Sequence, residues 1–168
     1  MKYWEFNIHA YKGIKSLLSV DLSKKSLIPI IGVNECGKTT ILEAMLCFDR
    51  HNDDNYNGRH INHIQNLYSN KQQDIIISAV IDYKPKELIQ KLRSFLDTEM
   101  NYEEEDLDED EQHNKILLKE YVNAKLEEIK SQTSIEIFRN LNNQEYSFTK
   151  NGSSSEQEDS VCSEIVRL

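Results

Sequence analysis

The sequence has few cysteines, few prolines and no long apolar run. Its 168 residues include three cysteines and two prolines. An odd number of cysteines without metal-ligand spacing argues against a disulfide framework and against a cysteine metal centre. The longest apolar stretches, 27–31 and 75–81, fall far short of the roughly 20 residues that span a bilayer, and no charged-then-apolar leader precedes them. We therefore expect a cytoplasmic protein that contacts no membrane.

The sequence also lacks a surplus of basic residues. It has 20 lysines and arginines against 29 aspartates and glutamates, a net charge of −9. Eight of the acidic residues lie between Glu103 and Glu111, and without them 21 acidic residues nearly balance the 20 basic ones. The basic stripe that binds nucleic acid is missing, so any contact with DNA would be indirect. Like charges repel, and we expect the acidic run to form a flexible loop over residues 99–112.

What the sequence does contain is a phosphate-binding motif. Residues 27–31 are apolar, including Pro29, and predict a strand. Residues 32–39 then read G-V-N-E-C-G-K-T, and the apolar spacing of residues 41–48 predicts a helix that begins at Lys38. A strand before the motif and a helix after it are the context in which G-x-x-x-x-G-K-T binds the phosphates of a nucleotide.

Each residue type in this motif has a chemical task. Gly32 and Gly37 lack a Cβ, so the loop can turn its backbone N–H groups toward an anion. The helix N-terminus adds partial positive charge. Lys38, the candidate catalytic residue, can reach the β- and γ-phosphates, and the Thr39 hydroxyl can ligate Mg²⁺. The residues expected to bind the nucleotide are Gly32, Asn34, Glu35, Cys36, Gly37, Lys38, Thr39 and Thr40.

The remainder of the chain alternates between strand and helix patterns. Period-2 and β-branched segments predict strands at residues 3–10, 18–22, 75–82, 134–139 and 146–150. Apolar stripes predict helices at residues 84–96 and 113–130, and a Ser/Gly/Glu-rich stretch predicts a linker at residues 151–160. Together with the motif these segments predict one α/β (mixed α+β) domain over residues 1–168, in which residues 1–50 hold the strand pair, the phosphate loop and its helix.

The first part of the chain resembles a known group of ATPases. A strand pair with the turn Y-K-G-I at 11–14, followed by G-V-N-E-C-G-K-T-T-I-L-E-A at 32–44, is similar to the ABC-type ATPase heads of the RecF, SMC and OLD group. The likeness is closest to OLD-like ATPases, AAA-type proteins often fused to a nuclease domain and involved in DNA repair or anti-phage defence. It is specific over about residues 1–50 and looser to about residue 150.

The resemblance carries expectations of its own. It implies a P-loop NTPase lobe with a mixed β-sheet and an N-terminal antiparallel strand pair. It also implies ATP and Mg²⁺ as cofactors, residues 34–40 around the triphosphate, and Lys12 near the nucleotide.

Two parts of such a head are missing from the sequence. The group needs an apolar strand ending in Asp-Glu and a Ser-Gly-Gly-type signature. Here Asp82 ends an apolar run but is followed by Tyr83, and no Ser-Gly-Gly occurs. We therefore expect no hydrolysis by this chain alone, and a partner that is either the rest of its own ATPase head or a dimer partner. A small P-loop kinase and a non-catalytic nucleotide-binding module remain as alternatives.

Two further signals stay open. His60 and His63 are three residues apart and could hold a metal, although a solvated surface segment explains them as well. Cys36 lies inside the phosphate loop, where its thiol could be open to redox control.

Overall fold

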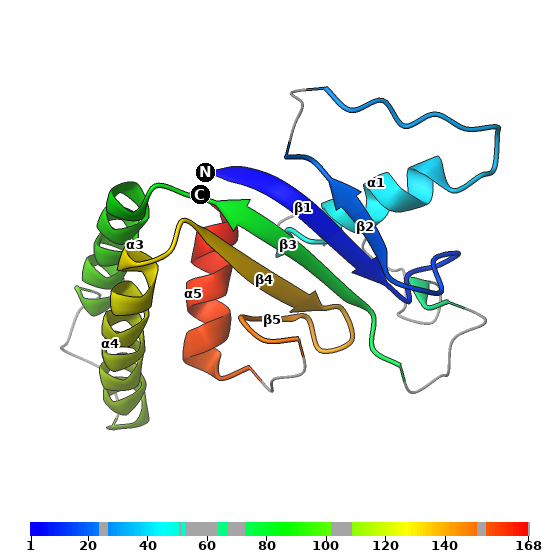
Figure 1. Ribbon diagram of the computed structural model, residues 1–168. Coiled ribbons are helices and arrows are strands. Elements are labelled where there is room, and N and C mark those ends of the chain that lie inside the picture. Colours follow the sequence, from blue (N-terminus) through cyan, green and yellow to red (C-terminus); the bar gives the residue numbers. More distant parts are fainter. Residues whose placement is uncertain are drawn as a thin grey trace.

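The computed structural model describes residues 1–23, 27–50, 52, 64–66, 73–101, 109–150 and 154–167 (Figure 1). Within these ranges one five-stranded sheet has the order β2-β1-β3-β4-β5, with every pairing antiparallel. The strands are β1 (Lys2–His9), β2 (Leu18–Asp21), β3 (Ile76–Asp82), β4 (Ser134–Asn140) and β5 (Glu145–Ser147). The helices are α1 (Lys38–Leu46), α3 (Pro85–Met100), α4 (Glu109–Lys130) and α5 (Glu156–Arg167).

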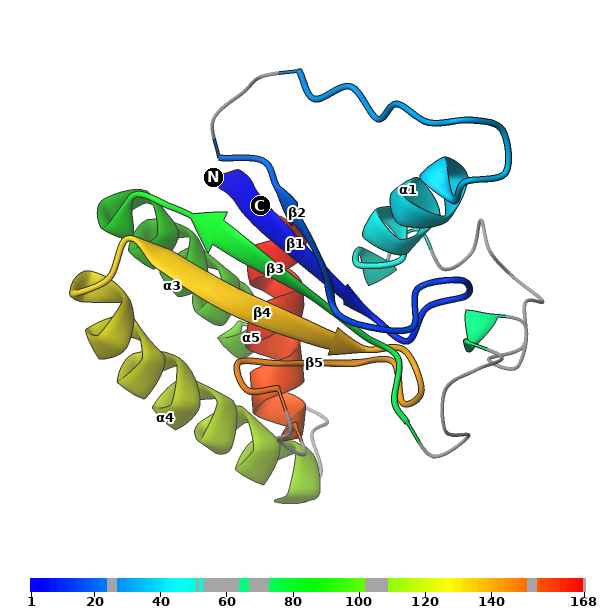
Figure 2. The same cartoon turned by 45° about the vertical axis from the view of Figure 1, so that its right-hand side comes forward.

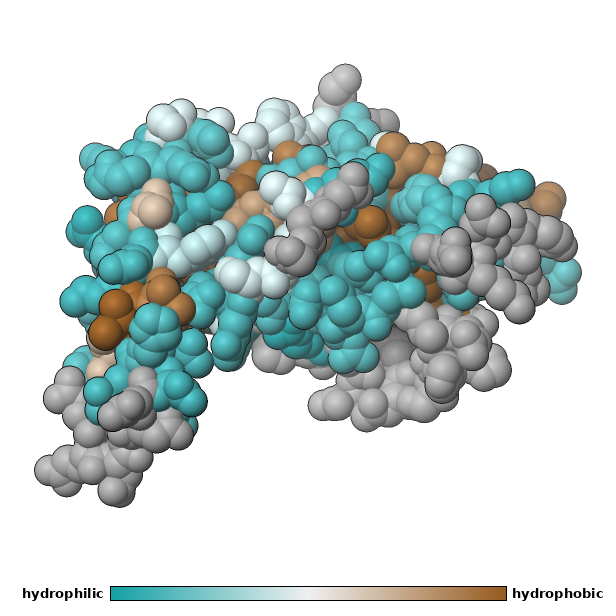
Figure 3. All heavy atoms as spheres, turned by 90° about the horizontal axis from the view of Figure 1, so that it is seen from below, coloured by the Kyte–Doolittle hydropathy of each residue, from teal (hydrophilic) through white to brown (hydrophobic). Residues whose placement is uncertain are grey.

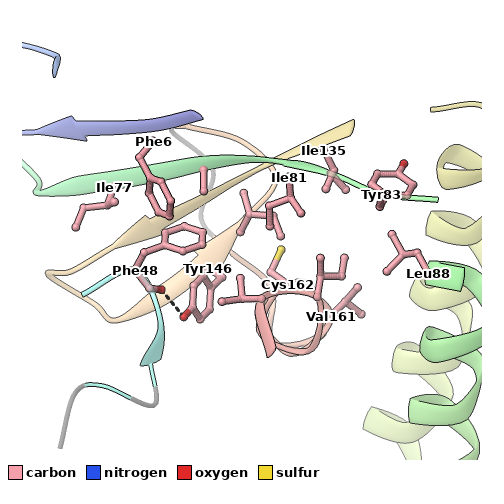
Figure 4. Packing of buried hydrophobic residues seen from close by; sticks show 14 of the residues in the cluster. Phe6, Phe48, Ile77, Ile81, Tyr83, Leu88, Ile135, Tyr146, Val161 and Cys162 are labelled. Carbon is pink, nitrogen blue, oxygen red and sulfur yellow. Dashed lines mark hydrogen bonds between the residues drawn. The ribbon is translucent and has the colours of Figure 1, made fainter. Parts of the chain in front are cut away.

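Alternation along the strands places the apolar residues on one face of the sheet. Phe6 pairs in register with Ala79, and Ala79 pairs with Ile137, so buried side chains from three strands lie side by side. A register shift between Tyr3 and Glu5 keeps Tyr3 on the same face as Phe6, and their rings stack with centroids 5.1 Å apart. This face points toward α5, as Figure 4 shows.

Helix α5 covers that face with a single stripe. Val161, Cys162, Ile165 and Val166 are buried and recur at the spacing of one side of a helix. Helices α3 and α4 pack against each other beside the sheet (Figures 1 and 2). Seen from below, the surface is mostly hydrophilic with apolar residues in small patches (Figure 3). Within the described ranges, no helix has both the length and the apolar character needed to cross a membrane.

Several predictions from the sequence are confirmed. The structure has the N-terminal strand pair, the helix beginning at Lys38, the strand ending at Asp82 and the hairpin of β4 and β5. The fold class, α and β elements in one lobe that contains a P-loop helix, is confirmed as well.

The strand predicted at residues 27–31 is wrong. Residues 27–36 form no strand, and Leu27, Ile31 and Val33 are 81%, 89% and 79% exposed. An apolar, β-branched run favours a strand only where a neighbouring strand satisfies its backbone N–H and C=O groups, and Pro29 removes one of those donors. Without this strand the described sheet is antiparallel throughout, and not the mixed sheet that the resemblance implied.

Two segments predicted to lack regular structure are largely helical where the structure describes them. Helix α3 continues to Met100 and α4 begins at Glu109, so both edges of the expected acidic loop (99–112) are helical. Helix α5 begins at Glu156, inside the expected linker (151–160), because the Ser155 hydroxyl accepts a hydrogen bond from the Glu158 N–H at 3.1 Å. The acidic residues 102–108, the linker residues 151–153, and His60 and His63 lie outside the described residues.

Candidate functional site

The phosphate loop lies outside the sheet and leads directly into α1. In Figures 1 and 2 the segment from residue 27 to residue 37 runs beyond β2 and returns to the N-terminus of the helix. Asn34, Glu35 and Cys36 are exposed. Glu35 has φ 66° and Gly37, the N-cap residue, has φ 94°. Two left-handed residues within three positions give the loop its tight turn, and at Gly37 the missing Cβ removes the steric cost.

Lys38 folds its side chain back into this loop. Its Nζ donates hydrogen bonds to the carbonyl oxygens of Gly32 and Val33, both at 2.7 Å, and lies 3.8 Å from Cys36 Sγ. Carbonyl dipoles are weaker partners for an ammonium group than ionised oxygens are. A phosphate group that entered the loop would therefore compete for Lys38 on favourable terms.

The first turn of α1 is open to an anion. The N-cap makes no side-chain hydrogen bond, and the first turn carries no acidic residue. The first N–H groups of the helix thus keep their partial positive charge. Thr39 in this turn is exposed and Thr40 is half-buried, so both hydroxyl-bearing residues lie next to the loop. The uncapped N–H groups, the ammonium and the hydroxyl of Thr39 together fit a nucleotide phosphate with its Mg²⁺.

Gly32 has a role that the motif alone explains only in part. A Cβ at Gly32 would overlap Cys36 Sγ, so the absence of a side chain at position 32 makes room for the cysteine thiol. Cys36 is an exposed free thiol, whereas the free thiol Cys47, the C-cap residue of α1, is buried. The structure therefore brings Gly32, Cys36 and Lys38 together around one small turn.

Sequence reasoning did not find the contacts that hold the other end of α1. The Tyr146 hydroxyl donates to the Phe48 carbonyl at 2.7 Å, drawn as a dashed line in Figure 4, and accepts from the Arg50 N–H at 2.8 Å. Arg139 is fully buried, donates to the Cys47 carbonyl, and lies 5.3 Å from the centroid of the Tyr146 ring. Burial raises the pKa of Tyr146 to about 12. These contacts satisfy the carbonyls of Cys47 and Phe48, the two residues that follow the helix.

Helix α5 joins the same group of contacts. Asp159 accepts a hydrogen bond from Arg50 Nη2 at 2.5 Å and another from the Tyr146 N–H at 2.7 Å. Arg50 Nη2 also donates to the Gln144 carbonyl at 2.8 Å. Because Arg50 and Asp159 are 109 positions apart, no local pattern in the sequence could have paired them. We call Arg50, Arg139, Tyr146 and Asp159 the helix clamp.

Asp82, which ends the apolar run where the group needs Asp-Glu, lies at the end of β3 away from the turn that follows β1. Asp82 is exposed at the end of β3, in register with Lys2 and Ser134, whereas the turn at 10–13 follows the other end of β1. Among the described residues no group of three or more His, Cys, Asp or Glu side chains could hold a metal ion. The described part of the chain thus offers a phosphate-binding loop without an acidic metal site beside it.

Comparison with known protein families supports a nucleotide-binding site in this chain. The family model described as the AAA ATPase domain matches residues 1–164. Neither the curated proteins nor the solved structures contain a significant match to the chain. The family match covers nearly the whole chain, including the phosphate loop, α1 and the helix clamp. The chain therefore belongs to the AAA ATPase domain family, a family of nucleotide-binding ATPases.

Proposed function

We propose that this chain is the ATP-binding lobe of an ABC/OLD-like ATPase and that hydrolysis needs residues from a second polypeptide segment. The observation that carries the proposal is the position of Lys38, whose ammonium group is held inside the phosphate loop by two carbonyl oxygens at 2.7 Å. The loop is exposed and the helix behind it has no capping side chain. A triphosphate would find both a cation and free N–H donors at one place.

Binding is expected to rearrange only the loop. Lys38 would leave the carbonyls of Gly32 and Val33 and take the β- and γ-phosphate oxygens, which are stronger acceptors. The N–H groups from Asn34 to Thr40 would surround the phosphates, and the Thr39 hydroxyl would hold Mg²⁺. Mg²⁺, when bound, neutralises phosphate charge and orients the oxygens.

We propose further that a partner covers the apolar surface next to the loop. Leu27, Ile31 and Val33 are largely exposed, and Leu42 and Leu46 on α1 are each 49% exposed. Five large apolar side chains on adjoining segments are typical of a surface that another polypeptide buries. The backbone of residues 27–31 is also free to pair with a strand. The rest of an ATPase head or a dimer partner would supply this strand along with the missing acidic and signature residues.

The biological setting follows only from the likeness to OLD-like proteins. We propose a role in DNA repair or anti-phage defence, with DNA contacted through the partner, because the chain itself has a net charge of −9 and no basic stripe. Loss of phage resistance or of repair on substitution of Lys38, tested with the complete protein in cells, would support that role. An unchanged phenotype would contradict it.

The experiment that tests the binding proposal is calorimetric titration of Mg-ATP into the wild-type chain, Lys38→Ala and Lys15→Ala. Lys15 is an exposed lysine outside the loop and controls for loss of surface charge. We expect saturable binding by the wild type and Lys15→Ala, and no measurable binding by Lys38→Ala. Equal binding by all three proteins would mean that the nucleotide binds outside the phosphate loop. No binding by the wild type would mean that this chain does not bind nucleotide independently.

A second measurement separates an ATPase lobe from a passive nucleotide binder. Phosphate release is followed for the chain alone and after addition of the partner polypeptide. We expect release only with the partner, and none with Lys38→Ala. Hydrolysis by the chain alone would contradict the need for a second set of residues.

A further inference from the structure

The turn after β1 is held in a strained conformation against the nucleotide-binding helix. Ala10 and Lys12 have φ 59° and 45°, a left-handed region that costs free energy for residues other than glycine. Such a turn persists only where its surroundings hold it. Tyr11, between the two strained residues, is fully buried, and the Lys12 N–H donates to the Ile64 carbonyl at 2.6 Å.

Two side chains of this turn contact α1 or the residue after it. Lys12 Nζ forms an ion pair with Glu43 Oε2, and the two side chains are only 23% and 20% exposed. The Tyr11 hydroxyl lies 3.6 Å from Cys47 Sγ. Glu43 and Cys47 are four positions apart and so lie on the same side of the helix. The turn therefore contacts the middle of α1 and its C-terminal end along one side.

Ile41, Ala44 and Met45 pack α1 against the core, and the helix clamp and the Lys12–Glu43 pair hold it further, with different consequences for the phosphate loop. The helix clamp holds the residues that follow the helix, from Cys47 to Arg50. A rigid helix held only at one end can still change direction, and a second contact along its length removes that freedom. Glu43 lies about 6 Å along the axis from Cys47, and Lys38 lies about 7 to 8 Å beyond Glu43. A small displacement at Glu43 is therefore enlarged at the loop.

We propose that Lys12 and Glu43 are positioning residues of the nucleotide site, which rests on the proposed ATP-binding function. Their ion pair sets the direction of α1 and hence the place of the Lys38 ammonium and the first-turn N–H groups. Neither residue touches the nucleotide. Since the pair is about four-fifths buried, it is stronger than an ion pair in open solvent.

The competing explanation is that Lys12 contacts a phosphate group directly. Exchanging the charges of Lys12 and Glu43 distinguishes this contact from a positioning role. Mg-ATP affinity is measured for the wild type, Lys12→Glu, Glu43→Lys, the double variant with both changes, and Lys12→Arg. The exposed pair Lys130–Glu127 on α4 is exchanged in the same way as a control. Thermal unfolding of every variant shows whether the fold is retained.

Positioning predicts that each single charge reversal weakens Mg-ATP binding about fivefold, that the double variant returns to within about twofold of the wild type, and that Lys12→Arg binds normally. The control exchange should leave the affinity unchanged. If the double variant binds Mg-ATP as weakly as Lys12→Glu does, a positive charge at position 12 is needed independently of Glu43, and the proposal is wrong. Unchanged affinity in both single variants would overturn it as well.

Hydrogen exchange without nucleotide tests the pair independently of ATP binding. Amide exchange in residues 41–46 should become faster in each single variant and return to the wild-type rate in the double variant. Unchanged rates in the single variants would refute the positioning role. If the wild type binds no nucleotide, the proposed function fails while this measurement still decides whether the pair holds the helix.

Discussion

At its C-terminal end helix α1 runs into buried contacts from β4, β5 and α5, whereas at its N-terminal end it emerges from a loop with exposed residues at 31–36. One end is held by the helix clamp and by the ring of Phe48, whose centroid lies 5.5 Å from that of the Phe6 ring. The other end has no side-chain cap. Binding loops are drawn from the least stable parts of a fold, and a rigid base lets them move without unfolding the rest.

The largest effect on stability is expected at the clamped end. Phe48→Ala should lower the free energy of unfolding by about 3–5 kcal/mol, because the removed ring leaves a cavity among the rings of Tyr3, Phe6 and Tyr146. Chemical denaturation of the wild type and variant measures the loss. Leu46→Ala, at a neighbouring side chain that is 49% exposed, should cost less than about 1 kcal/mol. Equal losses would remove the contrast between the two residues.

Asp159, the member of the helix clamp that lies on α5, is expected to contribute somewhat less to the free energy of unfolding. Asp159→Ala should lower the free energy of unfolding by about 2 kcal/mol, because the Tyr146 N–H and Arg50 Nη2 both lose an acceptor. Asp159→Asn keeps one acceptor oxygen and should cost about half as much. Both losses are calculated from the midpoints of denaturant unfolding, with the same m-value for the wild type and the variants. An unchanged free energy of unfolding in Asp159→Ala would show that the contacts of Asp159 do not stabilise this end of α1.

Alkaline pH should weaken the clamped end through Tyr146. Burial raises the pKa of this tyrosine from 10.0 to about 12, so the unfolded chain loses the phenol proton first as pH rises. The stabilisation is complete below the unfolded pKa and is lost as pH rises through the folded pKa. Between about pH 9 and about pH 11 the wild type should lose about 1 kcal/mol more than Tyr146→Phe. Parallel stability curves for the two proteins would contradict this assignment.

The smallest effect is expected at the loop end. Ile31→Ser and Val33→Ser should change the free energy of unfolding by less than about 0.5 kcal/mol, because both side chains are already in solvent. Thermal unfolding of the isolated chain provides the measurement. The same variants should bind the partner polypeptide more weakly. A stability loss as large as that of Asp159→Ala would mean that the segment packs against the chain itself.

Local patterns predicted much of the fold and the site. Alternation identified β1 and β2, a β-branched run identified β3, and two strand segments around residues 141–144 identified the β4–β5 hairpin. The G-x-x-x-x-G-K-T motif located the loop and the first residue of α1. At residues 155–158 the composition predicted a linker, whereas in the structure Ser155 caps α5. There the Glu158 carboxylate accepts from the Phe148 N–H, a contact that a capping pattern does not include.

The remainder depended on contacts between distant residues. The apolar run at 27–31 looks like a buried strand, yet whether it pairs depends on which strands lie beside it. A buried arginine at position 139 contradicts the usual exposure of that residue type, and its contacts with the Cys47 carbonyl and the ring of Tyr146 depend on the fold. Charge and hydropathy patterns give no information about partners this far apart.

The sequence by itself determined the chemistry of this protein, because a phosphate loop is built from backbone N–H groups and residues that are adjacent in the chain. The alternation of its strands is local in the same way. Only the tertiary structure decided how the loop is supported. The Arg50–Asp159 contact of the helix clamp joins residues 109 positions apart, and the Lys12–Glu43 pair joins residues 31 positions apart, so their free energy appears only when the fold brings them together.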